Sequence, residues 1–162
     1  MAGSGRTGRR CRVRGRRAQA LESWESLFCA QVAVFRRLRD DFRGTEITLG
    51  EYDVLYNLTL FDGQRLRLHE LNEHIVLTQP SLSRLVERME KQGLVRRERD
   101  PDDRRGTIVI ITDHGIEVQR RVGREHSDSI ARYMGSGLTV AELRTLRDLC
   151  EKLRAAQRDI TD

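Results

Sequence analysis

Residues 78–115, TQPSLSRLVERMEKQGLVRRERDPDDRRGTIVIITDHG, carry the pattern that decides the fold of this 162-residue chain. The first half predicts an amphipathic helix, because its apolar residues recur at three- and four-residue steps along one face. These apolar residues are Leu82, Leu85, Val86 and Met89. We expect Thr78 to accept hydrogen bonds from the first free amides, Pro80 to lie in the first turn, and Gly93 to end the helix.

Two short β-patterned runs follow this helix, at residues 94–99 and 107–112. The joint between them, DPDDRRG, is rich in turn residues, so the two runs predict a hairpin. Its tip carries two adjacent arginines, Arg104 and Arg105. A helix followed by a hairpin with a basic tip is the arrangement of a winged helix.

This segment resembles the signature of the MarR family of bacterial transcriptional regulators. The resemblance rests on Gly93-Leu94-Val95, Arg97, residues 100–105 and Ile111-Thr112-Asp113-His114-Gly115. It extends over residues 21–155 and is strongest between Leu49 and Gly115. It implies a winged helix-turn-helix that binds double-stranded DNA, with terminal helices that form a homodimer.

The rest of the chain predicts helices around this centre, so the expected fold class is α+β and mostly helical. Capping boxes begin helices at Thr48–Glu51 and Thr139–Glu142, and a brief helix is expected at residues 69–75 after a short strand at 64–68. We expect four regions: a basic disordered tail at 1–17, a dimerisation helix at 18–47, the winged helix-turn-helix at 48–115, and C-terminal dimerisation helices at 116–162.

The net charge of +5 comes from the N-terminus. Residues 1–17 hold seven of the 30 basic residues and no acid, so the remaining 23 basic and 25 acidic residues sum to −2. Eight of those 23 basic residues lie between Thr78 and Gly106. This local clustering favours contact with DNA phosphates more than the overall charge does. The tail is either a solvated extension or a basic arm for DNA.

The polar face of the 78–92 helix supplies the candidate DNA-binding residues. Base readout is expected from Gln79, Pro80, Ser81, Ser83 and Arg84, because such groups reach base edges in the major groove. Arg88 is expected to hold a phosphate. By resemblance, Arg105 enters the minor groove. Arg104 either joins it there or pairs with Asp100 or Asp102, the residues expected to stabilise the turn.

Several other functions lack their sequence patterns. The chain has no phosphate-binding Gly loop and no G-x-S-x-G or C-x-x-C motif, so we expect neither an enzyme nor a cofactor. No metal site is expected, since the four histidines suit surface or capping positions. No apolar run reaches the roughly 20 residues that span a bilayer, and no signal peptide is apparent. A cytoplasmic location without membrane contact is therefore expected.

The resemblance also implies sensing: a repressor released by a small, phenolic or anionic aromatic ligand. No residue identifies that ligand, and Trp24 is expected to pack in a core. One alternative is a redox-sensing regulator of the same fold, with Cys11 or Cys29 as the reactive thiol and Cys150 in the core. The other is a helical interaction module that does not bind DNA. The operator, the regulated genes and the direction of regulation are not encoded in any recognisable pattern.

Overall fold

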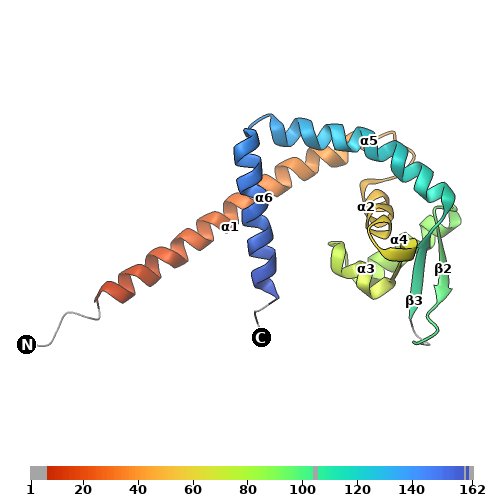
Figure 1. Ribbon diagram of the computed structural model, residues 1–162, viewed down its shortest axis with the longest axis horizontal. Helices are drawn as coiled ribbons and strands as arrows, with labels where there is room; N and C mark the ends of the chain where they lie inside the picture. Colours follow the sequence, from red (N-terminus) through yellow and green to blue (C-terminus); the bar gives the residue numbers. More distant parts are fainter. Residues whose placement is uncertain (1–6, 104–105, 159, 161–162) are drawn as a thin grey trace, which may run out of the picture. The chain divides into compact units, whose positions relative to one another are not determined.

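The computed structural model describes residues 7–103, 106–158 and 160, and side chains from Gly15 onward. That part of the chain forms six α-helices and a small antiparallel sheet, which confirms the α+β, mostly helical fold class. Figure 1 shows how these elements follow one another along the chain. The elements are α1 (Thr7–Asp41), α2 (Leu49–Thr59), η1 (Asp62–Gln64), β1 (Arg65–Arg67), α3 (Leu68–His74), α4 (Gln79–Lys91), β2 (Val95–Arg99), β3 (Thr107–Ile111), α5 (Asp113–Gly135) and α6 (Val140–Gln157). The chain divides into two compact units, residues 1–37 and 38–162.

The first unit is the N-terminal part of α1. The expectation of disorder up to residue 17 is wrong for residues 7–17, which are helical. Arginine is a good helix former and no proline interrupts this segment, whereas Gly8 and Gly15 disfavour a helix. Trp24 was expected in a core, but it is 62% exposed and stacks on Phe28 with ring centroids 5.9 Å apart. This aromatic pair is therefore an apolar surface of the single chain.

The second unit has its core between α2, α3, α4, α5 and the sheet. Fully buried side chains from the three short helices meet those of β3 and the start of α5. They include Val54, Leu55, Leu58, Leu71, Leu82, Val86, Met89, Val109 and Val118. This is the arrangement that the spacing of apolar residues in the sequence predicts, and it holds α4 with one face inside and the other outside.

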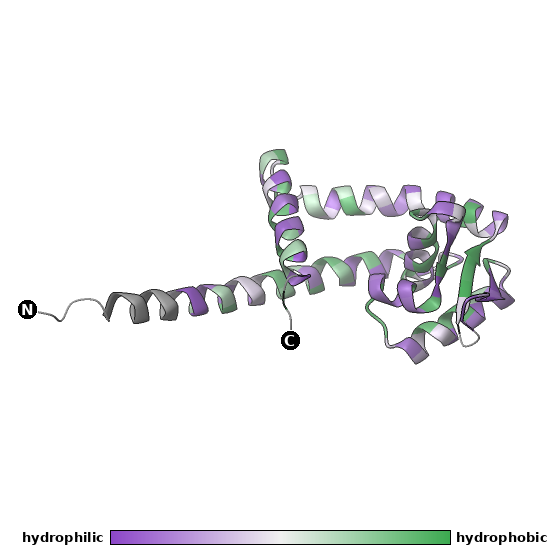
Figure 2. Ribbon diagram, turned by 60° about the horizontal axis from the view of Figure 1, so that its bottom comes forward, coloured by the Kyte–Doolittle hydropathy of each residue, from purple (hydrophilic) through white to green (hydrophobic). Residues whose placement is uncertain are grey.

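The sheet has the strand order β1-β3-β2, and both pairings are antiparallel. Val95 lies opposite Ile111 and Arg99 opposite Thr107, so β2 and β3 form the predicted hairpin. The central strand β3 is hydrophobic and β2 is hydrophilic, a contrast that Figure 2 shows. A buried central strand with a charged edge strand leaves one long edge of the hairpin open to solvent.

Caps and glycines set the boundaries of α4 and its neighbours. Thr48 caps α2 with the expected capping box, and Thr139 does the same for α6. Gly93 follows α4 at φ +73°, in the left-handed region that favours glycine. Thr78 makes no side-chain cap for α4, contrary to expectation. Its hydroxyl instead donates to the Ser81 hydroxyl at 2.9 Å, and its backbone carbonyl accepts from the first turn.

The last two helices, α5 and α6, differ in how many of their residues are buried. Thr112 caps α5 by accepting from the Gly115 amide at 3.0 Å, and α5 runs to Gly135. Helix α6 has no buried residue, although Leu146, Leu149, Cys150 and Leu153 form an apolar stripe along it. Cys150 on that stripe was expected in a core and is exposed. None of the helices described is both long and apolar enough to cross a membrane.

Candidate nucleic-acid interface

The outer face of α4 presents the residues predicted for base readout. Gln79, Pro80 and Arg84 are exposed, while Ser81 and Ser83 are half-buried at the same end of the helix. Leu82 and Leu85 hold the opposite face of that end in the core. A helix anchored by its apolar face presents its polar amino end as a rigid surface, which is the geometry that major-groove readout requires.

Arg88 lies one turn beyond Arg84 on α4 and is bound to an acid that the sequence did not reveal. Its Nε donates to Oε1 of Glu51 at 3.0 Å. The Arg88 side chain is 56% exposed, whereas that of Glu51 is 3% exposed. Burial would raise the pKa of Glu51, but hydrogen bonds from the Thr48 amide and hydroxyl and from Arg88 together lower it below its ordinary value. Glu51 is therefore a charged acid at the α2–α4 contact.

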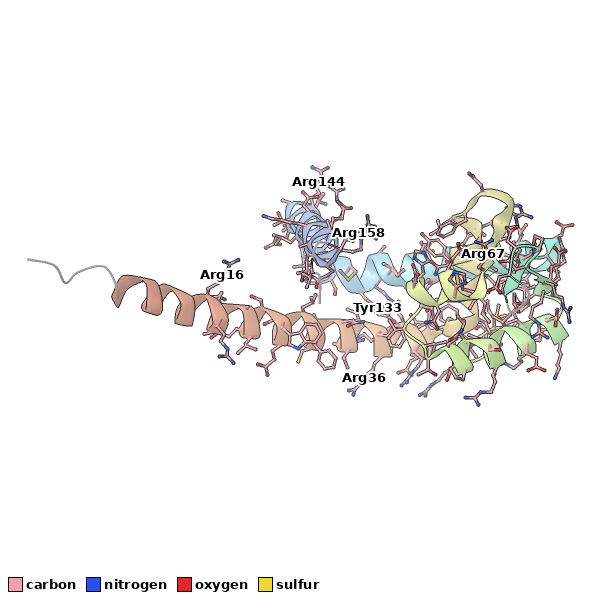
Figure 3. All side chains as sticks on the ribbon, turned by 90° about the horizontal axis from the view of Figure 1, so that it is seen from below. Arg16, Arg36, Arg67, Tyr133, Arg144 and Arg158 are labelled. Carbon is pink, nitrogen blue, oxygen red and sulfur yellow. The ribbon has the colours of Figure 1, made fainter. Side chains whose placement is uncertain are left out.

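The base of the wing is held by Arg67, another residue that sequence reasoning missed. Its Nε donates to Oδ2 of Asp100 at 2.5 Å, and its Nη2 donates to Oδ2 of Asp102 at 3.1 Å. The Asp102 amide donates to Oδ1 of Asp100 at 3.0 Å, and this bond and Arg67 lower the pKa of Asp100. Arg67, whose side chain is labelled in Figure 3, ends β1 and directly precedes α3, so it ties the wing to the start of α3.

The wing tip itself is only partly described. Arg104 and Arg105 lie outside the described residues, so their predicted places in the minor groove stay predictions. The flanking backbone closes the turn, since the Gly106 amide donates to the Asp103 carbonyl at 2.8 Å and the Asp100 amide to the Gly106 carbonyl at 3.1 Å. A Cβ on Gly106 would lie 2.8 Å from that of Asp100, so this corner requires a glycine.

Several of the other cations of α4 and the wing form ion pairs with neighbouring acids. Arg97 pairs with Glu90 at 2.7 Å and Lys91 with Glu87 at 3.7 Å. Arg96 pairs with Glu98. Within the described part of this surface, Arg65, Arg84 and Arg99 have no ion-pair partner. Of these three, Arg84 lies on α4 among the candidate base readers, which makes it the described cation best placed for DNA.

A second site lies where the last turn of α1 and the following loop meet α5. It is a cavity of about 180 Å³ lined by Asp41, Phe42, Thr45, Val122, Glu125, His126 and Ser129. Nδ1 of His126 and Oδ2 of Asp41 are buried there without a hydrogen-bond partner among the described atoms. The two carboxylates make this cavity more suitable for a cation or a neutral hydrogen-bond donor than for an anion.

His126 corrects the expectation that the histidines are surface or capping residues. It is 9% exposed, and its ring packs edge-on against Phe42 and Tyr52 at centroid distances of 5.2 Å and 4.8 Å. Burial lowers its pKa, and Asp41 acts in the opposite direction. The spacing from Val122 and Val118, four and eight residues earlier, was the available signal that His126 faces inward.

The thiols and acids of the described region form neither a disulfide nor a metal site. Cys29 and Cys150 are exposed and unpaired, and the side chain of Cys11 lies outside that region. Among the described residues, no group of three histidine, cysteine or acidic side chains is placed to hold a metal. The candidate sites in the described part of the chain are thus the outer face of α4, the wing held by Arg67, and the cavity between α1 and α5.

Comparison with known proteins identifies this arrangement. A family model described as MarR family matches residues 45–106. The chain is 29% identical over 131 residues to the HTH-type transcriptional regulator TtmR of Methylorubrum extorquens, a match covering 80% of this chain and 64% of TtmR. It is 32% identical over 75 residues to the organic hydroperoxide resistance transcriptional regulator of Bacillus subtilis, covering 46% and 50% of the two chains. The matches thus span about half to two thirds of these curated relatives.

A solved structure agrees over a longer stretch. Sco3205, a MarR family transcriptional regulator from Streptomyces coelicolor crystallised in complex with DNA, superposes with a TM-score of 0.74 at 31% identity. The superposition covers 86% of this chain and 88% of Sco3205. It extends from the winged helix into the flanking helices, which the family model does not cover. The chain belongs to the MarR family of transcriptional regulators.

Proposed function

We propose that this protein is a sequence-specific DNA-binding regulator that works in the cytoplasm as a homodimer and represses transcription from an inverted-repeat operator. The observation that carries the proposal is the amino end of α4: Gln79, Pro80 and Arg84 are exposed on a helix whose other face is fully anchored in the core. Arg67 braces the wing beside it. The DNA complex of the similar Sco3205 supports the same use of the fold.

Each protomer would place α4 in a major groove. Gln79 suits adenine, Arg84 suits guanine, and Pro80 suits a thymine methyl group. Arg105, and Arg104 beside it, would reach the adjacent minor groove, where narrow A·T-rich stretches concentrate negative potential. Two protomers related by a two-fold axis would then read half-sites about 34–36 Å apart.

Exposed apolar surface supports the homodimer. Leu21, Trp24 and Phe28 of α1 are each at least 49% exposed, and Leu149 and Leu153 of α6 are 59% and 51% exposed. Apolar stripes of this kind on terminal helices are stabilised by burial against another helix. A second copy of the chain supplies such helices, and it also provides the second recognition helix that an inverted repeat requires.

A small-molecule effector forms the last part of the proposal. Such a ligand releases DNA only if it binds the DNA-bound and free conformations with different affinities. The cavity beside His126 contains two carboxylates, Asp41 and Glu125, so it does not favour the anionic aromatic ligand that the resemblance implies. We therefore expect a phenolic or anionic effector to bind a surface that the dimer completes.

One alternative has a specific observation in its favour. Cys29 is exposed on α1, and one similar protein is an organic hydroperoxide resistance regulator. A redox-sensing regulator would lose DNA on peroxide treatment, and a Cys29→Ser variant would keep DNA bound under the same treatment. Loss of DNA from both proteins would exclude Cys29 as the sensor.

The wing provides the direct test of the DNA interface. Arg105→Ala should abolish specific operator binding in a fluorescence-anisotropy titration while the dimer stays folded, because a minor-groove cation is removed. The matched control is Arg144→Ala, which removes the same charge from an exposed position on α6. Unaltered binding of Arg105→Ala would refute the wing assignment, and equal losses in both variants would show a nonspecific charge effect.

A further inference from the structure

Glu51 is a buried carboxylate on the inner side of the candidate interface. Its Oε2 accepts from the Thr48 amide at 2.7 Å and from the Thr48 hydroxyl at 2.9 Å. Its Oε1 accepts from Arg88 Nε at 3.0 Å. One oxygen therefore closes the capping box of α2, and the other holds a side chain of the recognition helix. A capping box needs only the first of these contacts, so the second calls for its own explanation.

Glu51 holds the Arg88 guanidinium along one edge only, through its Nε. Among the described residues, its recorded ion pair uses Nε alone, and more than half of the side chain is exposed. The two Nη groups carry four further N–H donors in a plane that the Glu51 contact orients. On α4, Arg88 lies one turn beyond Arg84, about 6 Å further along the axis. A side chain at that point is beyond the base-reading end of the helix, where the phosphates at the edge of a groove lie.

We propose that Glu51 is a positioning residue for DNA binding: it holds the Arg88 guanidinium at the flank of α4 so that the Nη groups bind a backbone phosphate. This inference rests on the proposed DNA-binding function. Because Glu51 is buried and fixed by its bonds to Thr48, the guanidinium that it holds is ordered before DNA arrives.

Pre-ordering has a thermodynamic reason. A free arginine loses side-chain entropy when it binds a phosphate, whereas one already held by a carboxylate loses less. Glu51 cannot easily release Arg88, because a buried carboxylate without its cation is destabilised. The Thr48 bonds keep the acid ionised and in place, so the pair persists with or without DNA.

The experiment measures DNA affinity against salt concentration for four proteins: the wild type, Glu51→Gln, Arg88→Ala and the double variant. The probe is a 30-base-pair duplex carrying the site that the wild type selects from genomic fragments. Arg88→Ala should weaken binding about tenfold and lower the log–log salt slope by about 0.9, the value for one phosphate contact. Glu51→Gln should shift both quantities in the same direction, and the double variant should bind no more weakly than Arg88→Ala.

Glu46→Gln is the matched control. Glu46 holds Arg121 through a 2.9 Å bond to Nε, the same kind of contact, but neither residue lies on α4 or the wing. It should leave the salt slope unchanged. Arg88→Lys extends the test to a variant that keeps the charge opposite Glu51. A lysine has one head group and cannot bind both acid and phosphate in the arginine geometry, so its slope should also fall.

The outcomes separate the inference from the function on which it rests. If the wild type binds no duplex, the proposed function fails. If the wild type binds and Glu51→Gln keeps its affinity and slope, or binds more tightly, then Glu51 does not position Arg88 for DNA. A folded Arg88→Lys variant with an unchanged slope would overturn the inference even if Glu51→Gln failed to fold.

Discussion

Gly115 is a position where the packing of this fold allows no side chain. It lies in the first turn of α5, directly against the backbone that leads from α4 into β2. A Cβ at Gly115 would lie 2.1 Å from the Leu94 carbonyl oxygen and 2.9 Å from Cγ1 of Ile111. The same Leu94 carbonyl accepts hydrogen bonds from the Thr112 amide at 3.1 Å and the Thr112 hydroxyl at 3.0 Å. Gly115→Ala therefore forces α5 and the wing apart.

The size of the effect follows from these contacts. An ordinary carbon–oxygen contact needs more than 3 Å, so the helix start must move by about 1 Å, and overpacking of this kind costs roughly 1–3 kcal/mol. The shift also weakens the two hydrogen bonds to Leu94, each worth about 1 kcal/mol. The higher helix propensity of alanine returns about 1 kcal/mol at most. The expected loss is thus about 2–4 kcal/mol of the free energy of unfolding.

Urea unfolding followed by circular dichroism measures this loss, at one protein concentration because dimerisation contributes to stability. Gly135→Ala is the control, since Gly135 is the last residue of the same helix and a Cβ there meets nothing within 4 Å. It should be neutral or slightly stabilising. Equal stability of Gly115→Ala and Gly135→Ala would refute the placement of α5 against Leu94.

Further predictions concern the wing, a buried acid and the tail. Arg67→Ala should weaken operator binding at least several-fold in an anisotropy titration, because Asp100 and Asp102 lose the cation that holds the base of the wing. Unchanged affinity would show that DNA binding does not depend on these ion pairs. Burial raises the pKa of Asp53 from 3.8 to about 6, so its ionised form destabilises the fold above that pH. After allowance for solvent screening, Asp53→Asn should then raise the free energy of unfolding by about 1–3 kcal/mol at pH 8 and by much less at pH 4. An equal gain in stability at both pH values would show that the burial of an ionised Asp53 is not its cause. Neutralising the arginines of residues 6–17 should make the salt dependence of DNA binding shallower, since fewer counterions are released, and an unchanged slope would leave the tail without a role in binding.

Features that depend on near neighbours in the chain were predictable from the sequence. The apolar stripe of α4, the capping boxes at Thr48 and Thr139 and the glycine after α4 each need only residues within one or two turns. The hairpin was predictable for the same reason, because its turn residues and its two β-patterned runs are contiguous. These local signals together placed the winged helix and the exposed face of α4.

The contacts that organise the interface join residues far apart in the chain. Arg67 and Asp100 are 33 residues apart, and Glu51 and Arg88 are 37 apart. The sequence contains many arginines and acids, and no local pattern says which of them will pair. The hypothesis that Arg104 pairs with Asp100 or Asp102 was reasonable on proximity, but Arg67 is the described cation that binds both. Tertiary packing decides such pairs, so only the structure reveals them.

A selection from genomic fragments with purified protein, followed by a salt titration on the winning site, tests the central claim most directly. We expect an A·T-rich inverted repeat with half-sites about one helical turn apart, bound with a steep salt dependence. Neighbouring genes would then indicate what is regulated. Failure to enrich any sequence, together with no salt-sensitive affinity for random DNA, would contradict the account and leave a helical module that binds protein.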